Sequence, residues 1–190
     1  LTFKPSVELK LVSNISSIRE NDNLVIKAAK ILQEATNCFA GAEIHLEKQI
    51  PLSSGLGGGS SDAAATLLGL NKLWDLGIPK EQLLELGTRL GADVAFFING
   101  YGCAHGVGRG DILTQLPSLY GKWAVILYPE ILTPAHKTAT IYSHLSDREF
   151  SDGSKVIDLI AALKTKLDVH SKHCSNVFSD RFITEIFPSV

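Results

Sequence analysis

The sequence predicts an α+β fold in which helices pack on an antiparallel sheet. Strand-like alternation and helical apolar spacing interleave along the chain, but they do not repeat as regular strand–helix–strand units. A glycine-rich segment runs directly into an alanine-rich helical pattern, which is typical of an ordered loop and not of a linker. With 190 residues, 45% of them hydrophobic and 20% charged, the chain is long enough to bury a core in one or two domains.

The amino-terminal part of the chain predicts two strands separated by a helix. Residues 8–13 and 42–50 alternate between apolar and polar side chains, as half-buried strands do. Asn21 or Asp22 is expected to cap a helix that continues to about Ala35. The apolar residues of this helix recur at helical spacing: Leu24, Ala28, Ile31 and Leu32.

Further elements follow from the same patterns. The helix after the glycine-rich segment is expected to reach about Asp75, because Gly77 and Pro79 follow it, and a second helix covers residues 80–90. Strands are expected near residues 102–105 and 123–127, and helices near residues 137–144, 155–166 and 176–186.

The glycine-rich segment indicates a phosphate-binding loop. Glycine lets backbone N–H groups converge without hindrance from a Cβ atom, and the helix N-terminus adds unpaired N–H donors and the positive end of its dipole. The alternative is a flexible loop without a ligand. The candidate ATP-binding residues are Pro51, Leu52, Ser53, Ser54, Gly55, Leu56, Gly57, Gly58, Gly59, Ser60 and Ser61.

Two better-known phosphate motifs are excluded. A Walker A loop needs a lysine directly after its last glycine, and no lysine occurs between Ile50 and Lys72. A dinucleotide fingerprint needs a glycine where this chain has Ser60. The hydroxyls of Ser60 and Ser61 are candidates to reach phosphate oxygens or Mg²⁺; alternatively one of them caps the following helix, and Asp62 complements the helix dipole.

At these residues the chain resembles the GHMP kinases. The segment Pro-x-x-x-Gly-Leu-Gly-Gly-Gly-Ser-Ser-Asp-Ala-Ala is similar to the family's second motif, and residues 23–29, 91–97 and 106–111 resemble further family segments, although most relatives have proline in place of Ala95. The resemblance implies a two-lobe architecture. Residues 1–118 would form an ATP-binding amino-terminal lobe like domain 2 of ribosomal protein S5, without its first strand, and residues 119–190 the start of an α/β carboxy-terminal lobe.

The resemblance also implies the reaction. GHMP kinases use ATP and Mg²⁺ to phosphorylate small-molecule alcohols, and the triple glycine before Ser-Ser-Asp is closest to a branch that acts on a cytidylyl derivative of an erythritol in isoprenoid biosynthesis. The alternatives are a GHMP kinase with another alcohol substrate and a non-catalytic nucleotide-binding relative. Both ends of the chain are expected to be cut, because the first residue is not methionine and the family's opening and closing motifs are missing.

Asp93 is the candidate catalytic residue. It lies between Gly91-Ala92 and an apolar stretch, and a carboxylate beside so much apolar surface is expected to be paired or functional. The alternative is that Asp93 caps a helix. The resemblance favours catalysis, since the family's catalytic aspartate occupies this position. The lysine that accompanies it in the family belongs to the missing opening motif, so that role is assigned to no residue here.

The substrate-binding candidates rest on the resemblance alone. Thr138 and Tyr142 lie in a segment similar to the one whose aromatic residue stacks on cytosine in the family. A base stack contributes about 1–3 kcal/mol. The alternative for Tyr142 is an ordinary half-buried helix aromatic.

Composition narrows the remaining classes. A net charge of −2 does not favour nucleic-acid binding, and no apolar run is long enough to span a membrane. Three widely spaced cysteines predict reduced thiols in the cytoplasm. His170, His173 and Cys174 lack the second ligand pair that structural zinc requires, so no protein-bound metal is expected there. Oligomeric state is left open.

Overall fold

The chain forms two compact units, Leu1–Gln115 and Leu116–Val190. The computed structural model describes residues 1–17, 20–121, 123–126, 142–143, 145–146, 150–165, 167, 169, 173 and 176. Within this described part, no helix has the length and apolar character needed to cross a membrane.

A three-stranded sheet forms one layer of the first unit. Its strands are β1 (Thr2–Ser6), β2 (Leu9–Ser13) and β3 (Gly41–Leu46), in the order β1-β3-β2. β1 pairs with β3 in antiparallel orientation, but β2 pairs with β3 in parallel orientation. The expected all-antiparallel sheet is therefore wrong for the second pair, because the chain crosses over through a helix between β2 and β3 and re-enters the sheet in the same direction.

The crossover helix α1 (Leu24–Thr36) follows a short 3₁₀ turn, η1 (Glu20–Asp22). Its N-cap is Asn23, whose side-chain oxygen accepts a hydrogen bond from the N–H of Val25 at 3.0 Å. The expected caps, Asn21 and Asp22, are wrong by one or two residues, because both belong to the 3₁₀ turn that leads into the cap.

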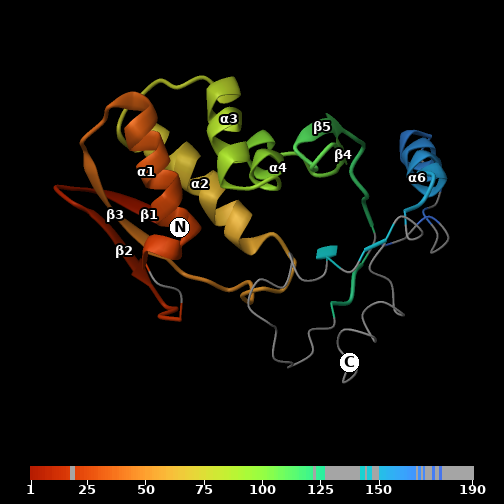
Figure 1. Ribbon diagram of the computed structural model, residues 1–190, viewed down its shortest axis with the longest axis horizontal. Helices are drawn as coiled ribbons and strands as arrows, with labels where there is room; N and C mark the ends of the chain where they lie inside the picture. The colour runs from red at the N-terminus through yellow and green to blue at the C-terminus, as the bar shows by residue number, and fades with distance from the viewer. Residues whose placement is uncertain are drawn as a thin grey trace. The chain divides into compact units, whose positions relative to one another are not determined.

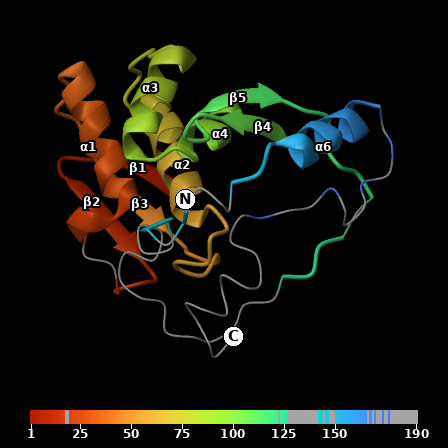
Figure 2. The same cartoon turned by 45° about the vertical axis from the view of Figure 1, so that its right-hand side comes forward.

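Three more helices complete the helical layer: α2 (Gly58–Leu73), α3 (Lys80–Leu90) and α4 (Val94–Asn99). α1 and α2 pack against each other and against strands of the sheet, so that helices cover one face of it (Figures 1 and 2). α3 and α4 pack on the far side of α2 from β1 (Figure 1). The largest fully buried apolar side chains come from both layers: Val25, Leu32, Ile44, Leu67, Leu70 and Val94.

Specific contacts fix α2 on the sheet. A Cβ atom at Gly69 would lie 2.4 Å from the ring of Phe3, so glycine is required for β1 to approach the helix. At the C-cap of the helix, five residues further on, the indole N–H of Trp74 donates a hydrogen bond to the carbonyl oxygen of Gly41 at 3.1 Å. These contacts hold the helix that carries the glycine-rich loop at its N-terminus.

The predicted strand over residues 42–50 is shorter in the structure. β3 ends at Leu46, and the next residues leave the sheet towards the glycine-rich loop. Asn14 then binds the backbone of Lys48 on both sides: its amide donates to the Lys48 carbonyl at 3.1 Å, and its oxygen accepts from the Lys48 N–H at 2.8 Å. A side chain replaces the ladder partner that a continuing strand would need.

A hairpin completes the first unit. β4 (Ala104–Val107) and β5 (Ile112–Gln115) are antiparallel, and the strand expected at residues 102–105 begins two residues later. Arg109 lies at the turn and donates to the carboxylate of Asp111 at 3.0 Å. This pairing places Arg109 at a charged hairpin tip.

In the second unit, α6 (Ser154–Lys164) confirms the helix expected at residues 155–166. The strand expected at residues 123–127 is wrong over residues 123–126, which have irregular structure and are exposed; Trp123 is 98% exposed. The described residues offer this segment no pairing strand, and apolar alternation alone does not supply one. Most of residues 137–144 and 176–186 lie outside the described residues.

Candidate active site

The loop before α2 has an unusual backbone. Ser53, Gly55 and Gly57 have positive φ angles of 56°, 79° and 70°. Left-handed residues at alternate positions turn successive N–H groups towards one side of the chain, which produces a concave surface suited to anions. The nonglycine residue in this set, Ser53, is held in a conformation that is uncommon for it.

The same loop leaves the N-terminus of α2 open. Gly57 is the N-cap and supplies no side-chain cap, and the first helical hydrogen bond runs from the N–H of Ser61 to the Gly57 carbonyl at 2.9 Å. The backbone N–H groups of Gly58, Gly59 and Ser60 therefore have no partner within the helix. Together with the helix dipole they form a set of donors for a negatively charged group.

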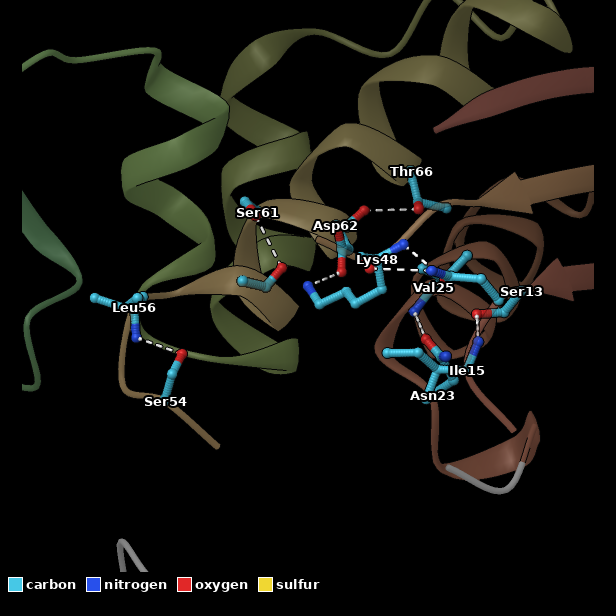
Figure 3. Close-up of polar contacts among 12 residues, drawn as sticks. Ser13, Ile15, Asn23, Val25, Lys48, Ser54, Leu56, Ser61, Asp62 and Thr66 are labelled. Atoms are coloured by element: carbon cyan, nitrogen blue, oxygen red, sulfur yellow. Dashed lines mark hydrogen bonds and ion pairs between the residues drawn. The ribbon is translucent and has the colours of Figure 1, made fainter. Parts of the chain in front are cut away.

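Ser60 and Ser61 lie inside α2. The expectation that one of them caps α2 is wrong, because the left-handed Gly57 starts the helix three residues earlier. The hydroxyl of Ser61 donates to the Gly58 carbonyl at 2.8 Å (Figure 3), and its oxygen keeps lone pairs for a further contact.

Asp62 differs from its expected role. It is the fifth residue of α2, beyond the first turn, and its carboxylate is bound by the ammonium group of Lys48 at 2.5 Å (Figure 3). The Lys48 side chain is 7% exposed and that of Asp62 is 19% exposed. The carboxylate thus forms a partly buried ion pair and does not simply complement the helix dipole.

Lys48 is the residue that the sequence analysis missed. Lys48 precedes the glycine-rich loop by three residues in the sequence, so it is not part of the loop motif. In the folded chain its side chain lies next to Gly58, at the end of the loop. A Cβ atom at Gly58 would lie 2.8 Å from the Lys48 ammonium nitrogen and 2.9 Å from a methyl carbon of Ile50. A larger residue at position 58 would therefore displace one or both of these side chains.

Asp93 occupies the N-cap position of α4, but its side chain makes no cap hydrogen bond. The position matches the capping alternative, but the side chain does not act as a cap. The residue is exposed, whereas Val94, Ala95 and Ile98 are buried. The apolar neighbours therefore face the core and do not enclose the carboxylate. Among the described residues, the carboxylate has no hydrogen-bond or ion-pair partner.

The start of α4 lies close to the end of the loop. A Cβ atom at Gly57 would be 2.9 Å from the edge of the Phe97 ring, so the loop touches this helix directly. Asp93 and Phe97 are four residues apart and share one face of α4. The backbone of Asp93 is about 6 Å along the helix axis from that of Phe97, the residue that approaches Gly57. Asp93 and the loop therefore border the same region of the first unit.

The two substrate-binding candidates belong to the second unit. Thr138 lies outside the described residues. Tyr142 has helical backbone geometry, as the alternative of a half-buried helix aromatic expects, but at 61% exposed it is not half-buried. Over the described ranges there is also no group of three His, Cys, Asp or Glu side chains that could hold a metal ion.

Comparison with known proteins defines the class. Residues 23–101 match the family model of the GHMP kinases N terminal domain, a range that includes the loop and Asp93. The chain belongs to the GHMP kinase family.

Individual relatives share one activity in their names. The chain is 40% identical over 193 residues to a 4-diphosphocytidyl-2-C-methyl-D-erythritol kinase of Dehalococcoides mccartyi, covering 100% of this chain and 66% of that protein. It is 48% identical over 137 residues to the enzyme of the same name from Shewanella piezotolerans, covering 69% of this chain and 46% of that protein. The chain thus spans about two thirds or less of the length of these relatives.

Two solved kinase structures are similar to this chain. A crystal structure of 4-(cytidine 5'-diphospho)-2C-methyl-D-erythritol kinase matches with a TM-score of 0.72 at 30% identity, covering 98% of this chain and 64% of that one. A homoserine kinase from Cytophaga hutchinsonii matches with a TM-score of 0.57 at 18% identity over 86% of this chain and 56% of that one, which supports the fold alone. These matches confirm the predicted α+β fold of the GHMP kinase type.

Proposed function

We propose that this protein is an ATP-dependent kinase that phosphorylates the 2-hydroxyl of 4-diphosphocytidyl-2-C-methyl-D-erythritol in isoprenoid precursor synthesis. The observation that carries the proposal is the loop before α2, with left-handed residues at alternate positions and an open helix N-terminus. The names of the relatives support the choice of alcohol over other substrates of the family.

In this proposal residues 51–61 hold the triphosphate of ATP. The backbone N–H groups of the loop and of the first turn of α2 donate to phosphate oxygens. The hydroxyls of Ser60 and Ser61 lie in the same turn and offer oxygen atoms to the phosphates or to a metal ion. No lysine of the loop itself is needed, in contrast with P-loop enzymes.

The residues present are compatible with Mg²⁺. This ion prefers oxygen ligands and usually binds through one or two protein groups together with substrate phosphates. Ser60 and Ser61 supply such oxygens at the start of α2. When bound with ATP, Mg²⁺ neutralises phosphate charge.

Asp93 acts as the general base. Its carboxylate takes the proton of the substrate 2-hydroxyl while that oxygen forms a bond to the γ-phosphorus and the bond to ADP breaks. An exposed carboxylate that is bound by none of the described residues is available for this task. The helix N-terminus of α2 offsets the charge that remains on the phosphates.

The remaining assignments complete the proposal. Thr138 and Tyr142 bind the cytidylyl substrate, with the exposed Tyr142 ring stacking on cytosine. Residues 1–118 form the ATP-binding domain, and residues 119–190 begin the carboxy-terminal domain. Cys38 and Cys103 are free thiols, which fits a cytoplasmic location.

A matched pair of glycine variants tests ATP binding at the loop. Gly55 and Gly77 both have positive φ, of 79° and 62°, and at both positions a Cβ atom would meet nothing within 4 Å. Alanine at either site carries about the same backbone strain of 1–2 kcal/mol, but only Gly55 lies in the loop. In the full-length protein, Gly55→Ala should weaken ATP binding about 5- to 30-fold by isothermal titration calorimetry. Gly77→Ala should leave it unchanged. Equal ATP affinity in both variants would contradict phosphate binding by this loop.

A further inference from the structure

The carboxylate of Asp62 places a negative charge near the proposed phosphate site. Asp62 is the fifth residue of α2, so its backbone lies about 6 Å along the axis from the first residue of the helix. An unpaired carboxylate near this end of the helix would repel a bound polyphosphate, because effective dielectric constants near protein surfaces are far below that of water. The side chain is 19% exposed, so solvent screens it only in part.

Lys48 lies where it can cancel this repulsion. Its ammonium group contacts the Asp62 carboxylate, and its side chain is 7% exposed (Figure 3). The same nitrogen lies beside Gly58, the first residue of α2, where a Cβ atom would approach it to 2.8 Å. The ammonium group is thus near the end of the helix where the unpaired N–H groups are.

The position of Lys48 is set by the chain around it. Asn14, directly after β2, binds both the N–H and the carbonyl of Lys48, and its own N–H donates to the carbonyl of Leu46 at 3.4 Å. The backbone of Lys48 is therefore fixed where β3 has ended. Only the extended side chain then has to reach Asp62, which lowers the conformational freedom lost in forming the pair.

We propose that Lys48 is a positioning and charge-balancing residue for ATP: by binding Asp62 it removes a negative charge from beneath the phosphate-binding loop. This inference rests on the proposed function, since it requires ATP at residues 51–61. It assigns no direct contact between Lys48 and ATP. The selectivity that follows is for ligands with several phosphates, because the repulsion by an unpaired carboxylate grows with ligand charge.

A double-mutant cycle in the full-length protein tests the inference, with ATP, ADP and AMP titrated by calorimetry. Lys48→Met leaves the Asp62 carboxylate unpaired and should weaken ATP binding by about tenfold or more, ADP less and AMP least. Adding Asp62→Asn to Lys48→Met removes the carboxylate and should restore ATP affinity to within about threefold of the wild type. Melting temperatures are measured in parallel.

Three outcomes would overturn the inference. If the double variant binds ATP as weakly as Lys48→Met, Lys48 contacts the phosphates directly. If all three nucleotides weaken equally in Lys48→Met, the pair only stabilises the fold. If Lys48→Met does not fold, Asp62→Asn alone decides: the inference expects ATP affinity to rise or remain unchanged, and a loss of affinity contradicts it. Failure of the wild type to bind ATP would instead reject the proposed function.

Discussion

Replacing Asp93 separates catalysis from stability, because its side chain has no hydrogen-bond or ion-pair partner in the part of the chain that the structure describes. Asp93→Asn keeps the size of the side chain but removes the base. Loss of general-base participation should lower kcat about 10²- to 10⁴-fold. That corresponds to about 2.7–5.4 kcal/mol in the activation barrier. ATP affinity should be unchanged, since the loop and the start of α2 remain intact.

The contribution of the Asp93 side chain to folding stability is expected to be small. An aspartate that caps a helix contributes about 1 kcal/mol, but the side chain of Asp93 makes no cap bond. Asp93→Ala should therefore change the free energy of unfolding by no more than about 0.5 kcal/mol, and the melting temperature by about 2 °C or less. Asn23→Ala provides the calibration, because Asn23 does cap α1. It should lower the melting temperature by about 2–4 °C.

The assay couples ADP formation to NADH oxidation in the full-length protein, with thermal melts of the same preparations. A loss of turnover below tenfold in Asp93→Asn would refute the catalytic assignment. A melting temperature that falls as far in Asp93→Ala as in Asn23→Ala would show that Asp93 caps α4 in solution.

Three further predictions use other parts of the chain. Tyr142→Ala should raise KM for the cytidylyl substrate about 5- to 150-fold while KM for ATP stays within about twofold, and Tyr142→Phe should be nearly silent in the same steady-state assay; joint weakening of both ligands with a lower melting temperature would make Tyr142 a packing residue. A hydrogen bond from His45 lowers the pKa of Glu43 below its ordinary value of 4.5. The ionised Glu43 carboxylate therefore contributes stability that is present above pH 4.5 and is lost as the pH falls through the lowered pKa. Glu43→Gln removes this carboxylate and should flatten the acid side of a plot of melting temperature against pH. Trp74→Phe removes the hydrogen bond to Gly41 and should lower stability by about 1 kcal/mol in urea unfolding; an unchanged midpoint would contradict that contribution.

Local patterns predicted most of the elements in the first unit. α3 covers the expected residues 80–90, because Pro79 and Gly91 bound a strongly periodic segment. The cap of α1 was less certain, because Asn21, Asp22 and Asn23 are all good capping residues and only the tertiary path selects one. The parallel pairing of β2 with β3 depends on how the crossover helix packs, which periodicity does not encode.

In the candidate site, too, some features were predicted from the sequence and others were not. The glycine-rich loop was predicted from composition, because few other residues allow its left-handed angles. The Lys48–Asp62 pair was missed, since it joins residues 14 positions apart through the fold. The exposure of Asp93 was not predicted, because sequence neighbours of a residue at a helix start need not be its neighbours in space.

Phosphoryl transfer by the full-length protein tests the central claim most directly. The protein is incubated with ATP, Mg²⁺ and 4-diphosphocytidyl-2-C-methyl-D-erythritol, and the products are followed by ³¹P NMR, with homoserine as the competing alcohol. We expect ADP and a new phosphate monoester on the 2-hydroxyl of the erythritol moiety, and no product from homoserine. ATP binding without transfer to the cytidylyl substrate, or transfer to homoserine in its place, would contradict the account.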